Sequence, residues 1–340
     1  MHPAPLPLRQ RATLIVGALA FAAIASLLVA GMSGSVPVTL SELPQAVMQA
    51  LDGRGDTLAA SLVALRATRA LMAFVTGGAL ALAGVMMQAL LRNPLADPYV
   101  LGISAGASVG ALFALLLMCA AATVDAAAVA GAVAISLLLY LLARRDLKHG
   151  NAAEGGTSQL LLTGVILMSA AMALVTLMLS IAPESRLRSM VFWMIGDLAG
   201  VPLRLFPWVV LALALVYSLR NARGLNMLAL HAEAAATLGI RVGALRKGLF
   251  FVSAVLTASA VNTAGSIGFV GLIVPHACRF AFGPDHRVLI PSAVLAGGSL
   301  LVLCDTVART VIAPTQLPVG AITALIGAPV FLYQLHQLRK

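Results

Sequence analysis

Long apolar segments recur from one end of the chain to the other. Most contain roughly 17 to 25 residues with few charges, which is the length an α-helix needs to cross the hydrocarbon core of a bilayer. No polar stretch between them is long enough to fold as a separate soluble domain. The pattern predicts a single all-α integral membrane domain over residues 1–340. Its ten expected spans are residues 12–32, 67–91, 99–121, 124–143, 159–182, 206–219, 248–265, 267–283, 288–312 and 318–335.

Composition agrees with this pattern. The chain is 61% hydrophobic and only 10% charged, and its mean hydropathy is +1.00, so one soluble core could not hold its apolar residues. The first apolar segment follows Arg9 and Arg11 and has the look of a secretory signal peptide. Because it is long enough to span a bilayer and further spans follow, we interpret it as an uncleaved first helix.

The charge distribution predicts an orientation. The formal charge is +10, but the basic residues sit in short loops rather than on one face, so nucleic-acid binding is not indicated. Ten spans place both termini on one side. If that side is the cytoplasm, fifteen of the 22 Lys and Arg residues lie inside and seven outside, as the positive-inside rule requires. Both termini are therefore expected in the cytoplasm.

Three longer connections join the expected spans. Residues 33–62 and 183–205 lie outside in this orientation, and residues 220–247 form the longest inside loop. In that loop apolar residues recur at helical spacing with charges between them, which predicts one or two short helices on the cytoplasmic face. An irregular loop is the alternative, because connectors between spans need not be helical.

Two overlapping G-x-S-x-G patterns occupy Gly102–Gly106 and Gly106–Gly110. In serine hydrolases this pattern forms a strand-to-helix turn supported by a His and an acid. Here it lies in an apolar helix, where glycines four residues apart allow close helix packing. We therefore expect a packing role and no hydrolase activity.

Other catalytic and metal-binding patterns are missing from the sequence. It has no G-x-x-x-x-G-K-[ST] phosphate loop and no H-E-x-x-H. Its three cysteines, at positions 119, 278 and 304, lie in apolar segments without metal-ligand spacing and are expected to pack as small residues. We expect no catalytic residue, no metal and no cofactor bound by this chain.

Asp305 and Arg309 lie four residues apart near the outer end of the ninth expected span and could pair across one helical turn. A charge inside a span can also indicate a proton relay in an ion-coupled secondary transporter. The spans contain almost no other acids, which disfavours that class. A purely structural membrane scaffold is a further alternative.

Five segments carry a family resemblance. They are RATR at 66–69 leading to GVMMQALLRNPLADPYVLGISAGA at 84–107, GGTSQLLLTGV at 155–165, residues 225–242, GSIGFVGLIVPHACRFAFGPDHR at 265–287, and LPVGAITALIGAPVFLYQL at 317–335. Together they cover nearly the whole chain and resemble the FecCD-type permeases, which import vitamin B12, ferric siderophores and haem.

The resemblance implies the permease of a type II ATP-binding cassette (ABC) importer in a bacterial inner membrane. Members of the family are homodimers of ten-helix subunits with the translocation path between them. Two cytoplasmic ATPase subunits use ATP and Mg, and a periplasmic binding protein delivers the cargo. For this chain the expected cargo is an iron-containing chelate, with haem as the first choice and a siderophore or vitamin B12 as the alternatives.

The resemblance also assigns site residues. The coupling segment that meets the ATPase comprises Leu225, Asn226, Met227, Leu228, Leu230, His231, Glu233, Ala234, Leu238 and Gly239. His231 stands where the family usually has glycine, and Gln316 stands where it commonly has glutamate before Leu-Pro-Val-Gly.

Two further sets match functional positions of B12 permeases. Asn93, Leu95, Thr157 and Ser158 match the constriction of the cytoplasmic mouth, with an ordinary turn and a helix cap as the alternative. Arg66, Arg69 and Arg309 match arginines that dock the binding protein through its carboxylates. Interfacial anchoring is the alternative role for these arginines, with Arg309 paired to Asp305.

Overall fold

The structure is a computed structural model that describes residues 8–34, 36, 39, 41–52, 57–149, 155–230 and 232–337. Within these residues the chain forms fourteen α-helices and one 3₁₀ helix, and the protein is an all-α integral membrane protein. Ten apolar helices match the ten expected spans: α1 (Leu8–Met32), α3 (Leu58–Leu91), α4 (Ile103–Leu116), α5 (Ala121–His149), α6 (Gly155–Ile181), α8 (Phe206–Arg220), α11 (Val242–Ala264), α12 (Val270–Phe282), α13 (His286–Thr310) and α14 (Val319–Gln337).

Six of these helices are long and apolar enough to cross a membrane alone, whereas α4, α8, α12 and α14 have shorter apolar stretches. The third expected span begins with the separate 3₁₀ helix η1 (Pro98–Leu101), and Gly102 takes a left-handed conformation between η1 and α4. Four helices lie between the spans: α2 (Leu43–Leu51), α7 (Glu184–Ile195), α9 (Ala222–Leu230) and α10 (Ala232–Thr237). The expectation of one or two short helices in residues 220–247 is thus confirmed by α9 and α10.

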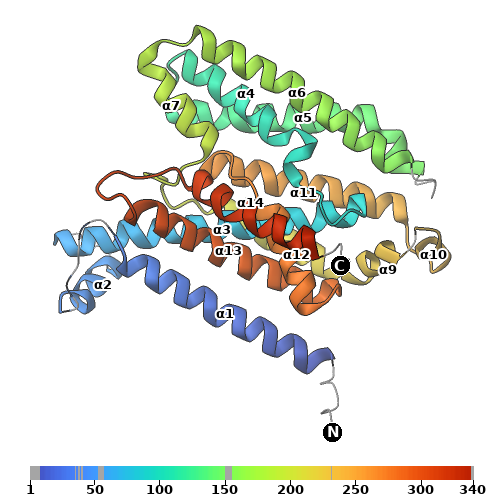
Figure 1. The fold of residues 1–340 in the computed structure, drawn as a ribbon, viewed down its shortest axis with the longest axis horizontal. Coiled ribbons are helices and arrows are strands. Elements are labelled where there is room, and N and C mark those ends of the chain that lie inside the picture. The colour runs from blue at the N-terminus through green and yellow to red at the C-terminus, as the bar shows by residue number, and fades with distance from the viewer. Residues whose placement is uncertain are drawn as a thin grey trace.

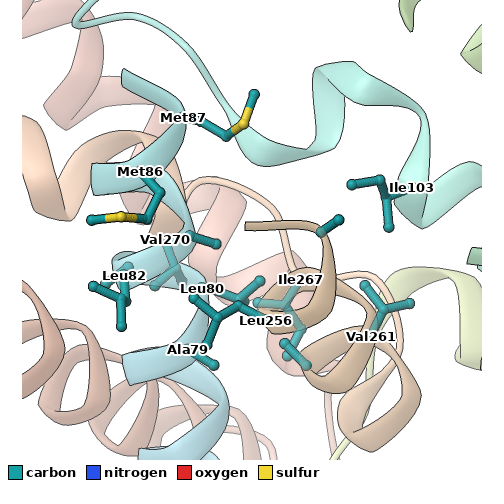
Figure 2. Packing of buried hydrophobic residues seen from close by; sticks show 14 of the residues in the cluster. Ala79, Leu80, Leu82, Met86, Met87, Ile103, Leu256, Val261, Ile267 and Val270 are labelled. Carbon is teal, nitrogen blue, oxygen red and sulfur yellow. The ribbon is translucent and has the colours of Figure 1, made fainter. Parts of the chain in front are cut away.

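Helix α3 runs through the middle of the bundle, with α13, α11 and α12 packed around it (Figure 1). Its apolar side chains from Met72 to Leu91 are almost all buried, including Leu80, Leu82 and Met86. Figure 2 shows Leu80 pointing toward Leu256 of α11. With 34 residues, α3 is about 51 Å long and exceeds the roughly 30 Å hydrocarbon core. One end of α3 therefore extends beyond the apolar layer.

Glycines allow the helices around α3 to approach closely. A Cβ on Gly84 would lie 1.8 Å from the Gly271 carbonyl oxygen of α12, so only glycine fits at position 84. The G-x-S-x-G segment behaves in the same way. A Cβ on Gly106 or Gly110 would lie 2.6 Å from the Gly131 oxygen or 1.9 Å from the Ala127 oxygen of α5. The expected packing role of this segment is confirmed.

The bundle has two distinguishable ends (Figure 1). One carries α2 and the connection between α13 and α14, and we call it the α2 end. The other carries α9 and α10, together with the start of α1 and the last turns of α14, and we call it the α9 end. The first span therefore begins, and the last span finishes, at the α9 end, as an even number of spans requires. Its placement in the cytoplasm stays a prediction.

Candidate functional site

A cavity of about 520 Å³ opens at the α2 end, between α3, α13 and the connection from α7 to α8. Arg66 and Arg69 of α3, Arg309 of α13 and Gln316 of the α13–α14 connection line it. Leu198 to Pro202 form the facing wall. We call this cavity the arginine pocket. The structure thus brings together the three arginines that the sequence assigned to docking, although they come from distant parts of the chain.

The Arg69 guanidinium, which lines the arginine pocket, binds Asp305 of α13. Its Nε lies 3.0 and 2.9 Å from the two carboxylate oxygens, and its Nη2 lies 2.8 Å from Oδ1. Its Nη1 donates to Gln316 Oε1 at 2.7 Å. Asp305 is only 1% exposed, so this pair is largely desolvated. The expected pairing of Asp305 with Arg309 is also present, at 3.6 Å, but Arg69 is the main partner.

Arg66 and Arg309 bind the carbonyl groups at the end of α1. Arg66 donates to Met32 O at 3.1 Å and to Val36 O, while Arg309 donates to Ser33 O at 2.8 Å and to Ala30 O. The last carbonyls of a helix have no intrahelical donor and carry its negative dipole end, so arginines suit this position. The chain leaves room for them at Gly34, where a Cβ would lie 2.3 Å from Arg66 Nη2.

The arginine pocket carries residual positive charge. Among the described residues, the carboxylates near its three guanidiniums are those of Asp305 and Asp197, and Asp197 lies 3.8 Å from Arg69 Nη2. The Arg66 acceptors are neutral carbonyls, Met32 O at the end of α1 and Val36 O beyond it, and Gln316 is a neutral amide. Three cations facing two anions suit the pocket to an incoming carboxylate, which arginine can bind through two parallel hydrogen bonds.

The loop at the α9 end separates into buried and exposed parts. Leu225 and Leu228 are 0% exposed and pack inside this chain, so they do not face a partner as the sequence suggested. Leu238, in contrast, is 62% exposed. Gly239 has φ +81° and ends α10 with a Schellman pair of hydrogen bonds, so its conformation requires glycine.

The remaining residues expected in the coupling segment divide as follows. Met227 is half-buried, and Asn226 binds residues at the start of α13. His231 and the side chains of Leu230, Glu233 and Ala234 lie outside the described residues.

The residues expected at the gate lie at the α9 end. Asn93 follows α3, and its Oδ1 accepts a hydrogen bond from Leu95 N at 2.9 Å, which closes a tight turn. Leu95 is 39% exposed. Thr157 and Ser158 lie in the first turn of α6, which starts earlier than expected, and their side chains lie outside the described residues. The turn expected as the alternative at Asn93 is present, and a gate role stays a prediction.

A polar contact near the gate turn was missed by sequence reasoning. Gln88 of α3 is buried, donates to Leu272 O at 3.2 Å and accepts from Arg279 Nη1 at 2.9 Å. A lone glutamine in an apolar span was the available signal, because a buried amide needs partners. The roles of Asp197 and Asp285 were also missed, because their partners Arg69 and Asn226 are distant in the sequence.

Comparison with known proteins identifies the family. A model of the FecCD transport family matches residues 18–337. The chain belongs to this family. It is accordingly an ABC importer permease, a multi-pass inner-membrane protein whose family transports rather than catalyses covalent chemistry.

Curated relatives agree with this family. The vitamin B12 import system permease BtuC of Escherichia coli O9:H4 is 40% identical over 281 residues, which is 81% of this chain and 83% of the relative. The cobalamin import system permease BtuC of Halobacterium salinarum is 42% identical over 277 residues, which is 80% of this chain and 72% of the relative. These relatives are named for vitamin B12 and not for haem, so they favour our alternative cargo over our first choice.

Solved structures support the fold. An inward-facing transporter of the metal-chelate ABC type aligns with a TM-score of 0.80 and 29% identity, over 96% of this chain and 99% of that one. PsaBC from Streptococcus pneumoniae, solved with a Fab, aligns with a TM-score of 0.57 and 18% identity, over 85% of this chain and 95% of that one. The expected type II importer permease fold is confirmed.

Proposed function

We propose that this chain is the permease of an importer for a cobalamin-type chelate. In this proposal it forms a homodimer that works with two cytoplasmic ATPase subunits and a periplasmic binding protein. The arginine pocket carries the proposal, because a positively charged cavity at one end of a membrane bundle suits a partner that presents carboxylates. The two B12 permease relatives support the choice of cargo.

The arginine pocket is the proposed docking site for the binding protein. Exposed ion pairs contribute only about 0.2 to 1 kcal/mol each, whereas truncating one partner of a pair desolvated at an interface costs about 2 to 5 kcal/mol. Arg66 and Arg309 are each 6% exposed in this chain. A carboxylate that enters the pocket would therefore meet guanidiniums that are already largely desolvated, and it would have to compete with the carbonyls of α1.

The loop at the α9 end is the proposed docking site for the ATPase. Leu225 and Leu228 fix α9 to the bundle, and the exposed Leu238 next to Gly239 offers an apolar contact to a partner. Met227 and the residues from Leu230 to Ala234 complete the segment that resembles family coupling helices. In the same proposal, Asn93, Leu95, Thr157 and Ser158 constrict the path at this end, next to the motor.

Reconstitution tests this function. The chain, its ATPase and its binding protein would be assembled in proteoliposomes, and ATP hydrolysis would be measured with vitamin B12, haem or a ferric siderophore on the binding protein. We expect vitamin B12 to stimulate hydrolysis and to accumulate inside the vesicles. Stimulation by haem alone would overturn the cobalamin cargo while keeping the importer. Uptake by the purified chain under an ion gradient, without ATPase, would overturn the importer.

A further inference from the structure

A polar bridge joins α9 to the start of α13. The side-chain amide of Asn226 donates from Nδ2 to Asp285 Oδ1 at 2.8 Å. Its Oδ1 accepts from the backbone N of His286 at 2.9 Å and lies 2.7 Å from His286 Nδ1. One side chain of α9 therefore makes three polar contacts with two adjacent residues of another element.

The chemistry of the bridge requires an amide at position 226. The oxygen of an amide only accepts, so His286 Nδ1 must carry a hydrogen toward it. With the amide turned around, its NH₂ group would face the His286 N–H, and its oxygen would face the carboxylate of Asp285. Among the described residues His286 Nε2 is buried without a hydrogen-bond partner, so the ring is held from its Nδ1 side.

Asp285 gives the bridge its acceptor. Burial acts to raise the pKa of this carboxyl group, but hydrogen bonds from Arg287 N and Asn226, together with the charge of Arg287, lower the pKa below its ordinary value. The group is therefore a carboxylate at neutral pH. The same Oδ1 accepts from Arg287 N at 2.9 Å and caps α13. The bridge thus binds directly to the first turn of α13.

Helix α13 connects this bridge with the arginine pocket. His286 is its first residue, and Asp305 and Arg309 lie in its last two turns. At a rise of 1.5 Å per residue, the 19 steps from His286 to Asp305 span about 28 Å. Pro291 lies inside α13 without interrupting the helix. One continuous helix therefore carries the partner of Asn226 at one end of the bundle and the partner of Arg69 at the other.

We propose that Asn226 is a positioning residue that ties the ATPase-docking loop to α13 and thereby couples the motor to the arginine pocket. The inference rests on the proposed function at both ends. A displacement of α9 by the ATPase would pull on the first turn of α13 through the bridge. A displacement of Asp305 or Arg309 at the docked end would reach α9 by the same helix. A continuous helix that both sites can displace is a physical element through which such coupling can act.

An exchange of the two side chains tests the bridge. Asn226→Asp would place two carboxylates against each other and remove the Nδ2 group that donates to Asp285. In the double variant Asn226→Asp/Asp285→Asn, the new carboxylate can still accept from His286 N and Nδ1. After a small rotation, the amide at position 285 can donate to that carboxylate while its oxygen still caps α13, because asparagine is as good an N-cap as aspartate.

The measurement is the ratio of ATP hydrolysis with and without the binding protein, in proteoliposomes that contain the full complex. Allosteric couplings are typically worth about fivefold or more, so we expect the ratio to fall about fivefold or more in Asn226→Asp and to recover in the double variant. Gln45→Glu is the control, because it makes the same amide-to-carboxylate change on exposed α2, outside both the loop at the α9 end and the arginine pocket. We expect its ratio to equal that of the wild type.

A purely structural bridge would affect assembly without affecting this ratio. An unchanged ratio in assembled Asn226→Asp complexes, or a ratio that stays low in assembled double-variant complexes, would overturn the proposal. If Asn226→Asp does not assemble, Asn226→Ser is used, because it breaks the bridge without adding charge. An unchanged ratio in Asn226→Ser would overturn the proposal. Failure of the wild-type chain to bind the ATPase would instead refute the proposed function.

Discussion

Arg69 of α3 and Asp305 of α13 form a buried ion pair between residues 236 positions apart in the sequence. Both carboxylate oxygens are bound by the guanidinium, and the carboxylate is almost fully withdrawn from solvent. The pair fixes the two helices that line the arginine pocket.

Loss of this pair should destabilise the protein. Asp305→Asn leaves two buried guanidiniums without their main counter-ion, and breaking a buried pair typically costs about 3 to 5 kcal/mol. We expect a clearly lower midpoint of thermal unfolding in detergent. Asp125→Asn is the control, since its 2.6 Å pair with Arg204 is about a third exposed and should contribute only about 0.2 to 1 kcal/mol. Equal shifts in the two variants would contradict the assigned burial.

Because Gln316 is a neutral amide, it should leave the arginine pocket more positive than a glutamate at this position would. Gln316→Glu keeps the size of the side chain and its bond to Arg69, but it supplies a third carboxylate to three arginines. We expect binding-protein affinity at low salt to fall about fivefold, equal to roughly 1 kcal/mol. Gln45→Glu adds the same charge on exposed α2, outside the pocket, and should have little effect. Equal affinities for both variants would exclude a carboxylate from the docked pocket.

Two leucines in the loop at the α9 end should behave differently. Leu238→Asp changes an exposed residue, so the chain should fold while the ATPase copurifies less, because a buried leucine contact is worth about 1.5 to 3 kcal/mol. Leu228→Asp places a charge in the core and should reduce the yield of folded chain itself. Size-exclusion chromatography and copurification separate the two effects. Undiminished ATPase binding by Leu238→Asp would remove this residue from the docking surface.

The close contact at Gly84 gives a stability prediction. Gly84→Ala forces α3 and α12 apart, and overpacking of this kind typically costs about 1 to 3 kcal/mol. We expect a lower unfolding midpoint in detergent. Gly17 of α1 has no atom within 4 Å of a new Cβ, so Gly17→Ala should leave stability unchanged or raise it by up to about 1 kcal/mol. A neutral Gly84→Ala would mean that the two helices pack less tightly than described.

The proposed gate predicts state-dependent crosslinking. Single Asn93→Cys and Leu95→Cys variants, made in a chain whose three native cysteines are replaced by alanine, should crosslink across the homodimer in one nucleotide state and not in another. Thr157→Cys and Ser158→Cys should follow the same pattern. Phe113→Cys, an exposed position in α4, serves as the comparison. If crosslinking is absent or independent of nucleotide at all four positions, these residues do not form a gate. Asn93 would then only stabilise the turn after α3.

The spans and short helices were predictable because they depend on local pattern. Apolar length defined the ten spans, and helical spacing alone indicated α9 and α10. The helices begin up to several residues from the expected boundaries, most clearly at α3, which starts at Leu58 and not at residue 67. Residues 58–66 are mostly apolar, but the segment after Arg66 is already long enough to span a bilayer, so a length argument placed the start too late.

Contacts between distant residues were not predictable in the same way. Local spacing suggested that Asp305 pairs with Arg309, whereas its stronger partner is Arg69 on another helix. Spacing marked Leu228 as part of an apolar face, and the resemblance added Leu225, but neither could tell whether a partner or the chain itself covers these leucines. Asn226 gave no local signal of its bridge, since Asp285 and His286 reach it only through the fold.

The arginine contacts at the end of α1 set an order of events during synthesis. Arg309 binds Ser33 O, and 276 residues separate the two in the chain. At about 5 to 20 residues per second, a ribosome needs on the order of 10 to 60 s to add that length. For this period the newly inserted α1 has no access to α13, the helix against which it mainly packs. Until α13 is made, the hydropathy of α1 and its contacts with α3 must hold it in the bilayer.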